Sequence, residues 1–282
     1  MASFHCLTFL TDYGLEDGFV AACHGVGFQI APKTRIIDIT HLVPPGDIRR
    51  GAAVLAQAVP YLPAAVHLAV VDPGVGTARR AVAIAAGGSV FVGPDNGLLS
   101  WAVAAAGGAT EVVSLTNRAL WLTTTVSATF HGRDIFMPVA AHLAAGTPLA
   151  AAGDTIDVAS LVTLPNPESH VIGGSAQAEV VIVDRFGNAQ LSVTAADAAR
   201  AGIVPGTAVM VAWSGNERPV PFAATFGEVP PGDLVSYPDS AGFVAIAVNA
   251  GSAARRLELR PGTRVTLTVV TSASPAGPSR NS

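Results

Sequence analysis

The chain has few charged residues and no long apolar run, and both shortages exclude classes of protein. Charged residues make up 13% of its 282 residues, and the formal net charge is -4. Because no stretch concentrates lysine and arginine, we expect no nucleic-acid partner. No apolar run reaches the roughly 18 residues that a membrane-spanning helix needs, so we also expect no membrane span.

Cysteines are scarce too, and the first residues lack the features of a targeting segment. Cys6 and Cys23 are the only cysteines. They could pair, but two buried free thiols in a cytoplasmic protein are the favoured interpretation. The opening stretch, MASFHCLTFLTDYG, has no basic region of the kind that begins a signal peptide. We therefore expect a cytoplasmic protein.

Three common signatures of chemical sites are missing. The seven histidines show no HxxxH or HxH spacing and the cysteines lie far apart, so we expect no metal site. The glycines of PGVGT are not followed by Gly-Lys-Ser/Thr, which argues against a phosphate-binding loop. No GxSxG sequence is present, which argues against a serine triad.

Strand-like and helix-like segments alternate over residues 1–165. Strands are expected in FHCLTFLT, TRIIDIT and AVHLAVV, and helices in FVAACHGVGFQI and IRRGAAVLAQA, the second capped by Asp47. AVAIAAGGSVFVGP predicts two strands joined at Gly87 and Gly88. The alternation predicts an α/β domain with a mostly parallel sheet covered by helices. Ligands of such sheets lie beyond the carboxyl ends of the strands, where Asp12, Asp38 and Asp72 make an acidic rim.

The pattern of predicted secondary structure changes near residue 165. LPNPESHVIGG has the composition of a linker, and short β-patterned runs such as AEVVIVD, TAVMVAW and RVTLTVVT follow it. Residues 166–270 therefore predict an all-β, barrel-like second domain. The small and polar residues 271–282 predict a disordered tail.

Four stretches concentrate residues that could do chemistry, and each also has a structural interpretation. They are FLTDYGLEDGF with Asp12, DPGVGTARR with Asp72 and Arg79, SATFHGRDIF with His131, and VDRFGNAQ with Asp184 and Asn188. Asp12 could cap the following helix, and Asp134 is expected to cap the helix IFMPVAAHLAAG. The glycines of PGVGT and the stretch DRFGN could serve tight turns alone. His131 could be a structural histidine.

Taken together, these stretches resemble one family, the S-adenosyl-L-methionine (SAM) hydroxide adenosyltransferases or SAM hydrolases, relatives of fluorinases and chlorinases. The resemblance runs through LTDYG, IIDITHLVPPGDIRRGA, VHLAVVDPGVGTARR, FVGPDNGLL, TFHGRDIF and VDRFGNAQLSV, and covers about residues 4 to 270. It implies an α/β domain followed by a β-barrel-like domain. It also implies homotrimers that bind SAM between the N-terminal domain of one subunit and the C-terminal domain of the next.

The resemblance also assigns roles to residues. The hydrolase branch carries an Asp-Arg-His triad, which falls on Asp72, Arg79 and His131, whereas the halide-binding motif of the halogenating branch has no counterpart here. The substrate-binding positions are Asp12 for the ribose hydroxyls, Asn188 for the adenine edge, Asp184 near the methionine amino group and Phe226 on the adenine ring. The halogenating enzymes use an arginine for the methionine carboxylate, and the matching position here is Val248. Asn249 or nearby backbone amides are expected to bind the carboxylate instead.

The implied reaction is attack of water or hydroxide on C5′ of SAM, which gives adenosine and L-methionine with no cofactor. Arg79 stays protonated and can hold a nascent hydroxide, His131 can relay a proton, and Asp72 can orient the water or Arg79. Two alternatives stay open at this stage: a halogenase that makes 5′-halo-5′-deoxyadenosine, and a non-catalytic protein that binds SAM or adenosine. Arg80, next to Arg79, is expected to face elsewhere.

Overall fold

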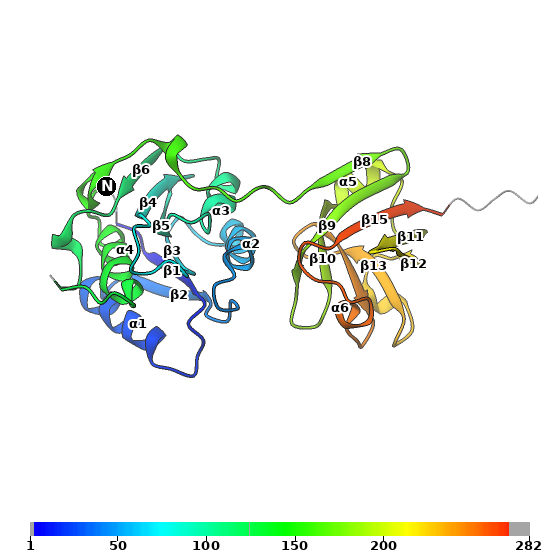
Figure 1. Ribbon diagram of the computed structural model, residues 1–282, viewed down its shortest axis with the longest axis horizontal. Helices are drawn as coiled ribbons and strands as arrows, with labels where there is room; N and C mark the ends of the chain where they lie inside the picture. The colour runs from blue at the N-terminus through cyan, green and yellow to red at the C-terminus, as the bar shows by residue number, and fades with distance from the viewer. Residues whose placement is uncertain (1–2, 124, 271–282) are drawn as a thin grey trace, which may run out of the picture. The chain divides into compact units, whose positions relative to one another are not determined.

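The chain folds into two units, each with its own hydrophobic core. The computed structural model describes residues 3–123 and 125–270, so the predicted tail at 271–282 lies outside the described residues. The first unit ends at Asn166 and the second begins at Pro167 (Figure 1). Within the described ranges, no helix is long and apolar enough to cross a bilayer.

One mixed β-sheet forms the centre of the first unit. Its strands are Cys6–Thr11 (β1), Arg35–Thr40 (β2), Val66–Val70 (β3), Ala81–Ala86 (β4), Ser89–Pro94 (β5), Glu111–Ser114 (β6) and Asp154–Thr155 (β7), in the order β2-β1-β3-β5-β4-β6-β7. The predicted parallel arrangement holds for β2, β1, β3 and β5. Strands β4, β6 and β7 pair antiparallel. The turn at Gly87 and Gly88 causes the reversal, because a two-residue connection joins only antiparallel strands.

Helices cover both faces of this sheet, as predicted. They are Phe19–Ile30 (α1), Ile48–Ala58 (α2), Ser100–Ala105 (α3) and Met137–Ala144 (α4). Helices α1 and α4 lie on one face, α2 and α3 on the other (Figure 1). Phe9 and Leu10 of β1 are both fully buried and belong to the two opposite cores, because neighbouring strand residues point to opposite faces.

Two local predictions in the first unit are confirmed. Asp47 caps α2, its carboxylate accepting a hydrogen bond from the Arg50 backbone N–H at 2.9 Å. Cys6 and Cys23 are both buried and unpaired, so the interpretation as free thiols holds. Burial raises the pKa of the Cys23 thiol to about 12, which makes it an inert core residue at neutral pH.

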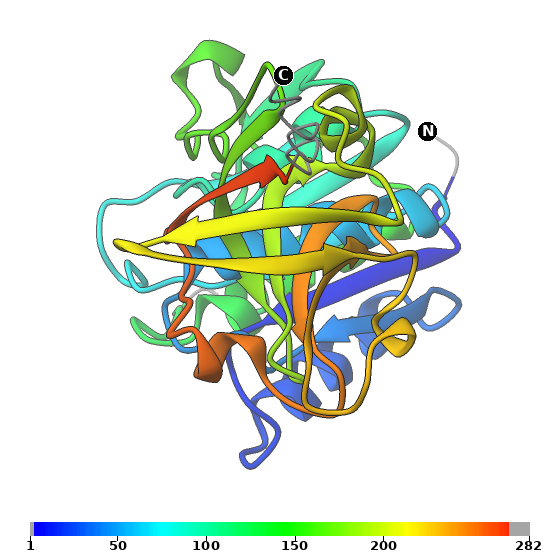
Figure 2. The same cartoon turned by 90° about the vertical axis from the view of Figure 1, so that its right-hand side faces the viewer.

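The second unit is a closed β-barrel, in agreement with the prediction. Its strands are Ser169–Ile172 (β8), Ser175–Val183 (β9), Ala189–Thr194 (β10), Thr207–Trp213 (β11), Asn216–Phe222 (β12), Leu234–Pro238 (β13), Phe243–Val248 (β14) and Arg264–Val269 (β15); its helices are Ala195–Arg200 (α5) and Ala253–Arg256 (α6). The strands from β9 to β15 close a ring through the β9–β10 pairing, and β8 adds to β9 outside the ring. Figure 2 looks onto this unit, with β11 and β12 in yellow.

Candidate active site

Strand β3 carries Asp72 to the carboxyl edge of the first sheet. Residues Val66–Val70 are buried throughout, and Val71 is fully buried as well. The Asp72 side chain keeps only 5% of its surface exposed. A carboxylate this deeply placed needs a compensating partner, because an unpaired buried charge is strongly destabilising.

The stretch DPGVGTA folds into a tight turn that brings the chain back toward Asp72. The Val75 N–H donates to the Asp72 carbonyl at 3.2 Å, and the Thr77 hydroxyl donates to the Gly74 carbonyl at 2.7 Å. Gly76 has a φ of +77°, and a Cβ there would lie 2.4 Å from the Ala128 carbonyl oxygen. Glycine is therefore required at position 76 both for the backbone conformation and for the close packing on residue 128.

Arg79 returns from this turn and joins Asp72 to His131. Its Nε lies 3.0 and 2.9 Å from the two Asp72 carboxylate oxygens, and its Nη2 lies 2.5 Å from Oδ2. The same Nη2 lies 2.8 Å from His131 Nδ1. The guanidinium also lies over the Phe136 ring, 5.0 Å from its centre, and its side chain is 11% exposed. The structure thus brings the three predicted triad residues into one hydrogen-bonded group.

The partners of His131 fix the position of its proton. A guanidinium has only N–H donors, so Nδ1 must accept from Arg79, and the neutral ring carries its proton on Nε2. Burial lowers the pKa of His131, and the Arg79 charge lowers it further. The imidazole is therefore neutral at pH 7 and presents an N–H donor at Nε2.

A short π-helical segment, Gly132–Phe136, places His131 just before α4. Such segments occur often at functional sites. A Cβ on Gly132 would lie 1.9 Å from the Tyr13 hydroxyl oxygen, so glycine is needed for this close contact. Burial raises the pKa of Tyr13 well above its usual value, and the charges of Asp12 and Asp72 act in the same direction. Sequence reasoning missed Tyr13, although it lies within the LTDYG motif.

Asp134 lies inside this π-helical segment, and its predicted capping role is wrong. The position before the segment is His131, and neither the segment nor α4 has a side-chain cap. The buried Asp134 carboxylate instead accepts the Ser127 backbone N–H at 2.8 Å and pairs with Arg133 at 2.6 Å. The bond to Ser127 ties the loop that precedes His131 to this segment.

Asp12 lies at the end of β1, the strand next to β3, and does not cap α1. Gly18 precedes α1 and makes no side-chain capping bond. The Asp12 carboxylate accepts the Gly46 N–H at 2.8 Å. Burial raises the pKa of Asp12, the Gly46 bond opposes this shift, and the Asp72 charge adds to it. Because β1 and β3 are parallel and Thr11 pairs with Val70, Asp12 follows its strand at the same sheet edge as Asp72.

Arg80 belongs to a separate network, as predicted. Its Nε lies 2.8 Å from Oδ2 of the nearly buried Asp95, and its Nη1 donates to the Ser160 hydroxyl at 2.9 Å. The neighbouring Arg79 and Arg80 thus pair with different carboxylates.

The second unit holds the other predicted residues around a loop between β9 and β10. Asp184 Oδ1 accepts the backbone N–H groups of Phe186 and Asn188, each at 2.9 Å, and its Oδ2 accepts the Asn188 side-chain amide at 2.8 Å. The DRFGN turn prediction is therefore also correct. The turn fixes Asn188 with its carbonyl oxygen turned away from Asp184, since the amide nitrogen is the atom bound there.

An open cavity of about 640 Å³ lies next to this turn. The residues that line it are Asp184, Phe186, Asn188, Phe226, Val248, Ala250, Gly251 and Arg255. The Phe226 side chain is 51% exposed and packs edge-on against Tyr237, with ring centres 6.0 Å apart. Sequence reasoning missed Arg255, which stands on α6 in a run of two arginines with no motif of its own.

Asn249 makes hydrogen bonds to a neighbouring loop. Its side-chain amide donates to the Val229 carbonyl at 2.7 Å, and its backbone carbonyl accepts the Gly232 N–H at 2.7 Å. Its neighbours Val248 and Ala250 line the cavity. Asn249 therefore holds the loop around residues 229–232, next to Phe226.

Comparisons with known proteins agree with this arrangement of two units. The model of the SAM hydroxide adenosyltransferase N-terminal domain matches residues 7–153, and that of the C-terminal domain matches residues 178–266. An (R)-S-adenosyl-L-methionine hydrolase of Salinispora tropica is 57% identical over 95% of this chain and 99% of its own length. A fluorinase of an Actinoplanes species is 30% identical over 93% of this chain and 97% of its own length.

Solved structures are similar over the same length. The crystal structure of an uncharacterized conserved protein from Thermotoga maritima matches with a TM-score of 0.88 and 38% identity, and covers 93% of this chain and 99% of that chain. These matches agree on the family of the chain. The chain belongs to the SAM hydroxide adenosyltransferase family.

Proposed function

We propose that the protein hydrolyses SAM, with water or hydroxide attacking C5′ to give adenosine and L-methionine. The observation that carries the proposal is the hydrogen-bonded group of Asp72, Arg79 and His131 at the edge of the first sheet. The 57% identical relative named (R)-S-adenosyl-L-methionine hydrolase supports it. The reaction needs SAM and water alone, so the proposal includes no cofactor.

The difficulty of this reaction lies at the nucleophile. The sulfonium leaves as a neutral thioether, so the leaving group needs no acid. Water must instead be held in line with the C5′–S bond and lose a proton as the bond forms. Positioning of one water, with bulk water excluded, supplies a large part of such an acceleration.

The proposal gives each triad residue a role, which its hydrogen bonds support. Asp72 neutralises and aligns Arg79 through two carboxylate oxygens. Arg79 places positive charge where hydroxide develops. His131 Nδ1 is occupied by Arg79, so the ring offers an Nε2–H that orients the water by donating to its oxygen. In this arrangement the triad stabilises hydroxide by charge and hydrogen bonds, and the water proton leaves to solvent.

The remaining predicted residues suit the other parts of SAM. Asp12 can accept the ribose hydroxyls, and Asn188 and Phe226 can bind the adenine edge and face. Asp184 has the charge to attract the methionine ammonium group. Arg255 is the one cation among the residues that line the cavity of the second unit. We therefore propose that Arg255, in place of Asn249, binds the methionine carboxylate.

The proposal extends to the assembly and the location of the protein. We propose a homotrimer in which the first unit of one subunit meets the second unit of the next and SAM binds where they meet. The two buried free thiols fit a reducing compartment, so we place the protein in the cytoplasm. Sedimentation of the purified chain would test the trimer; a monomer that still turns over SAM would overturn the shared site.

Product analysis tests the activity. Purified protein is incubated with SAM in halide-free buffer made with ¹⁸O-water. The products are separated by chromatography, and their masses are measured by mass spectrometry. We expect equal amounts of methionine and of adenosine carrying ¹⁸O on C5′. In chloride buffer, 5′-chloro-5′-deoxyadenosine in place of adenosine would reveal a halogenase, and tight SAM binding without products would reveal a pure binding protein.

A further inference from the structure

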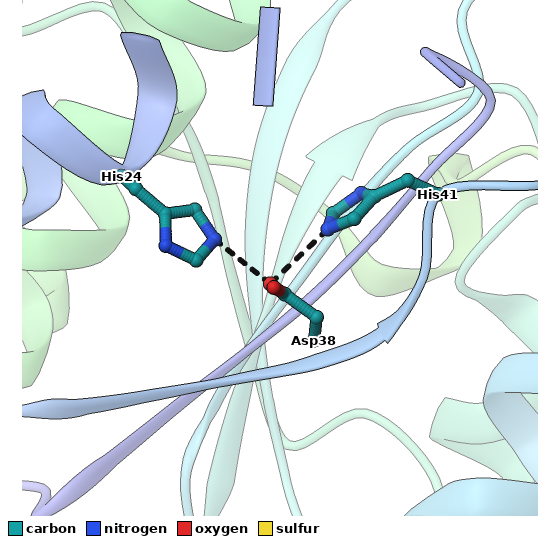
Figure 3. A group of neighbouring side chains, drawn as sticks. All are labelled: His24, Asp38 and His41. Carbon is teal, nitrogen blue, oxygen red and sulfur yellow. Dashed lines mark hydrogen bonds and ion pairs between the residues drawn. The ribbon is translucent and has the colours of Figure 1, made fainter. Parts of the chain in front are cut away.

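Three side chains from different segments of the first unit meet at one point outside the triad (Figure 3). His24 comes from α1, Asp38 from β2, and His41 from the chain just after β2. His24 Nε2 lies 2.8 Å from Asp38 Oδ1, and His41 Nε2 lies 3.1 Å from the same oxygen. All three atoms lie within 4.8 Å of one another. Both imidazole rings point their Nε2 edge toward the carboxylate (Figure 3).

Contacts with Thr11 and Phe9 hold the His41 ring in position. Its side chain is 3% exposed, and its Nδ1 lies 2.8 Å from the Thr11 hydroxyl, which is fully buried. The Phe9 ring packs edge-on against it, with ring centres 4.9 Å apart. A partner on the second ring nitrogen is the feature that fixes the tautomer and orientation of histidines that bind metals.

The other ring nitrogen of His41, Nε2, is buried and lacks a hydrogen bond to any of the described residues, although Asp38 Oδ1 lies only 3.1 Å away. The two atoms are close enough for an ion pair, but their geometry is not that of a hydrogen bond. An ion pair alone would leave this buried atom unsatisfied, which is costly.

We propose that His24, Asp38 and His41 bind a divalent transition-metal ion, with zinc as the probe of choice. Two imidazoles and one carboxylate are a common donor set for such ions, and the fourth position is left for water. Tetrahedral zinc with bonds of about 2.1 Å holds its ligand atoms about 3.4 Å apart. The two distances to Asp38 Oδ1 are already close to that separation.

The surroundings allow an ion to enter and to keep a water ligand. The side chains of His24 and Asp38 are 35% and 40% exposed, whereas His41 closes the inner side. One carboxylate also offsets part of the ion's charge. Rotation of the His24 and Asp38 side chains would let both reach an ion bound at the fixed His41.

The site lies apart from the proposed chemistry but touches the same loop. The His41 carbonyl accepts the Gly14 N–H at 2.8 Å, and the Thr11 hydroxyl accepts the Tyr13 N–H at 3.2 Å. A bound ion would therefore join α1 and β2 to the segment that carries Asp12. Its expected effect is on stability, and the binding test does not depend on SAM turnover.

Zinc binding by the full-length, untagged and EDTA-dialysed protein tests the proposal. Titration calorimetry with zinc chloride should show one ion per chain, and cobalt(II) should give the visible absorption of a four-coordinate site. H24Q and D38N should each weaken zinc binding at least tenfold, because each removes one of three ligands. Zinc should raise the Tm of the wild-type protein and leave that of H24Q unchanged.

The matched control is H170Q, which changes an exposed histidine on β8. It should bind zinc as the wild-type protein does. No stoichiometric zinc binding by the wild-type chain, or equal binding by H24Q and the wild type, would overturn the proposal. Because His24 is partly exposed, H24Q should fold, and an unchanged circular dichroism spectrum would confirm that loss of binding is loss of a ligand.

Discussion

The two units expose their candidate site residues to different degrees. In the first, Asp72 and Arg79 are nearly buried and bind each other and His131. In the second, Phe226 is half exposed beside an open cavity, and Phe186 is 71% exposed. A charge group that must stabilise a reacting atom is best assembled in advance, whereas a surface that binds a nucleoside can stay open until its ligand covers it. The contrast fits the proposal that the first unit carries the chemistry and the second contributes most of the substrate recognition.

The strongest test of this contrast is Arg79→Ala compared with Arg80→Ala. Loss of Arg79 should lower kcat for SAM hydrolysis by about 10²–10³-fold, because it removes the charge beside the nucleophile. Arg80 pairs with Asp95 in another network, so its loss should lower Tm but leave kcat within about threefold. Steady-state kinetics and thermal unfolding of both variants supply the measurement. Equal losses of kcat would refute the assignment of chemistry to Arg79.

Arg255→Met should act on binding instead. Loss of a charged hydrogen bond of about 1.5–3 kcal/mol corresponds to a KM about 10- to 100-fold higher, with kcat little changed. The discriminating substrate is decarboxylated SAM, which lacks the carboxylate. If Arg255 binds that group, the variant and the wild type should have similar KM values for the analogue. A kcat defect with unchanged KM would show that the second unit takes part in the chemistry.

Phe226→Ala should have a smaller effect of the same kind. Stacking of a base on an aromatic ring contributes about 1–3 kcal/mol, so KM should rise about tenfold. Phe28→Ala, which removes an exposed phenylalanine from α1, is the control and should leave KM unchanged. Adenosine binding by calorimetry should weaken in parallel with the rise in KM. Unchanged adenosine affinity would exclude Phe226 from the adenine site.

The smallest expected effect is that of mild acid on kcat. Between pH 8 and 6.5 we expect little change. The pKa of His131 is lowered below its ordinary value of 6.5, so the ring stays neutral as pH falls from 8 to 6.5. Protonation below that range turns Nδ1 into a donor that faces Arg79, which breaks the bond between them. The lowered pKa also means that folding stability from this group is present above pH 6.5 and is lost as pH falls through the folded pKa. A kcat–pH profile whose acid limb lies above pH 6.5 would contradict this account.

Much of the fold could be predicted because local rules decide it. The alternation of strands and helices, the Asp47 cap and the Gly87–Gly88 turn each depend on a few neighbouring residues. Asp134 shows the limit: its position before an apolar run is typical of a cap, yet contacts with Ser127 and Arg133 place it within a π-helical segment. Hydrogen bonds to residues seven and one positions away replaced the capping role there.

The two kinds of domain follow from patterns along the chain, and the family motifs predicted the three triad residues. Tertiary structure decides which side chains meet, such as Arg79 with Asp72 and His131, Arg80 with Asp95, and Asn249 with the 229–232 loop, and it places Arg255 at the open cavity. It also brought His24 to Asp38, 14 residues away, where the search for closely spaced histidines could not find it. Hydrophobic patterns can be read from neighbouring residues in the sequence. Contacts between side chains of separate elements depend instead on how strands and helices pack.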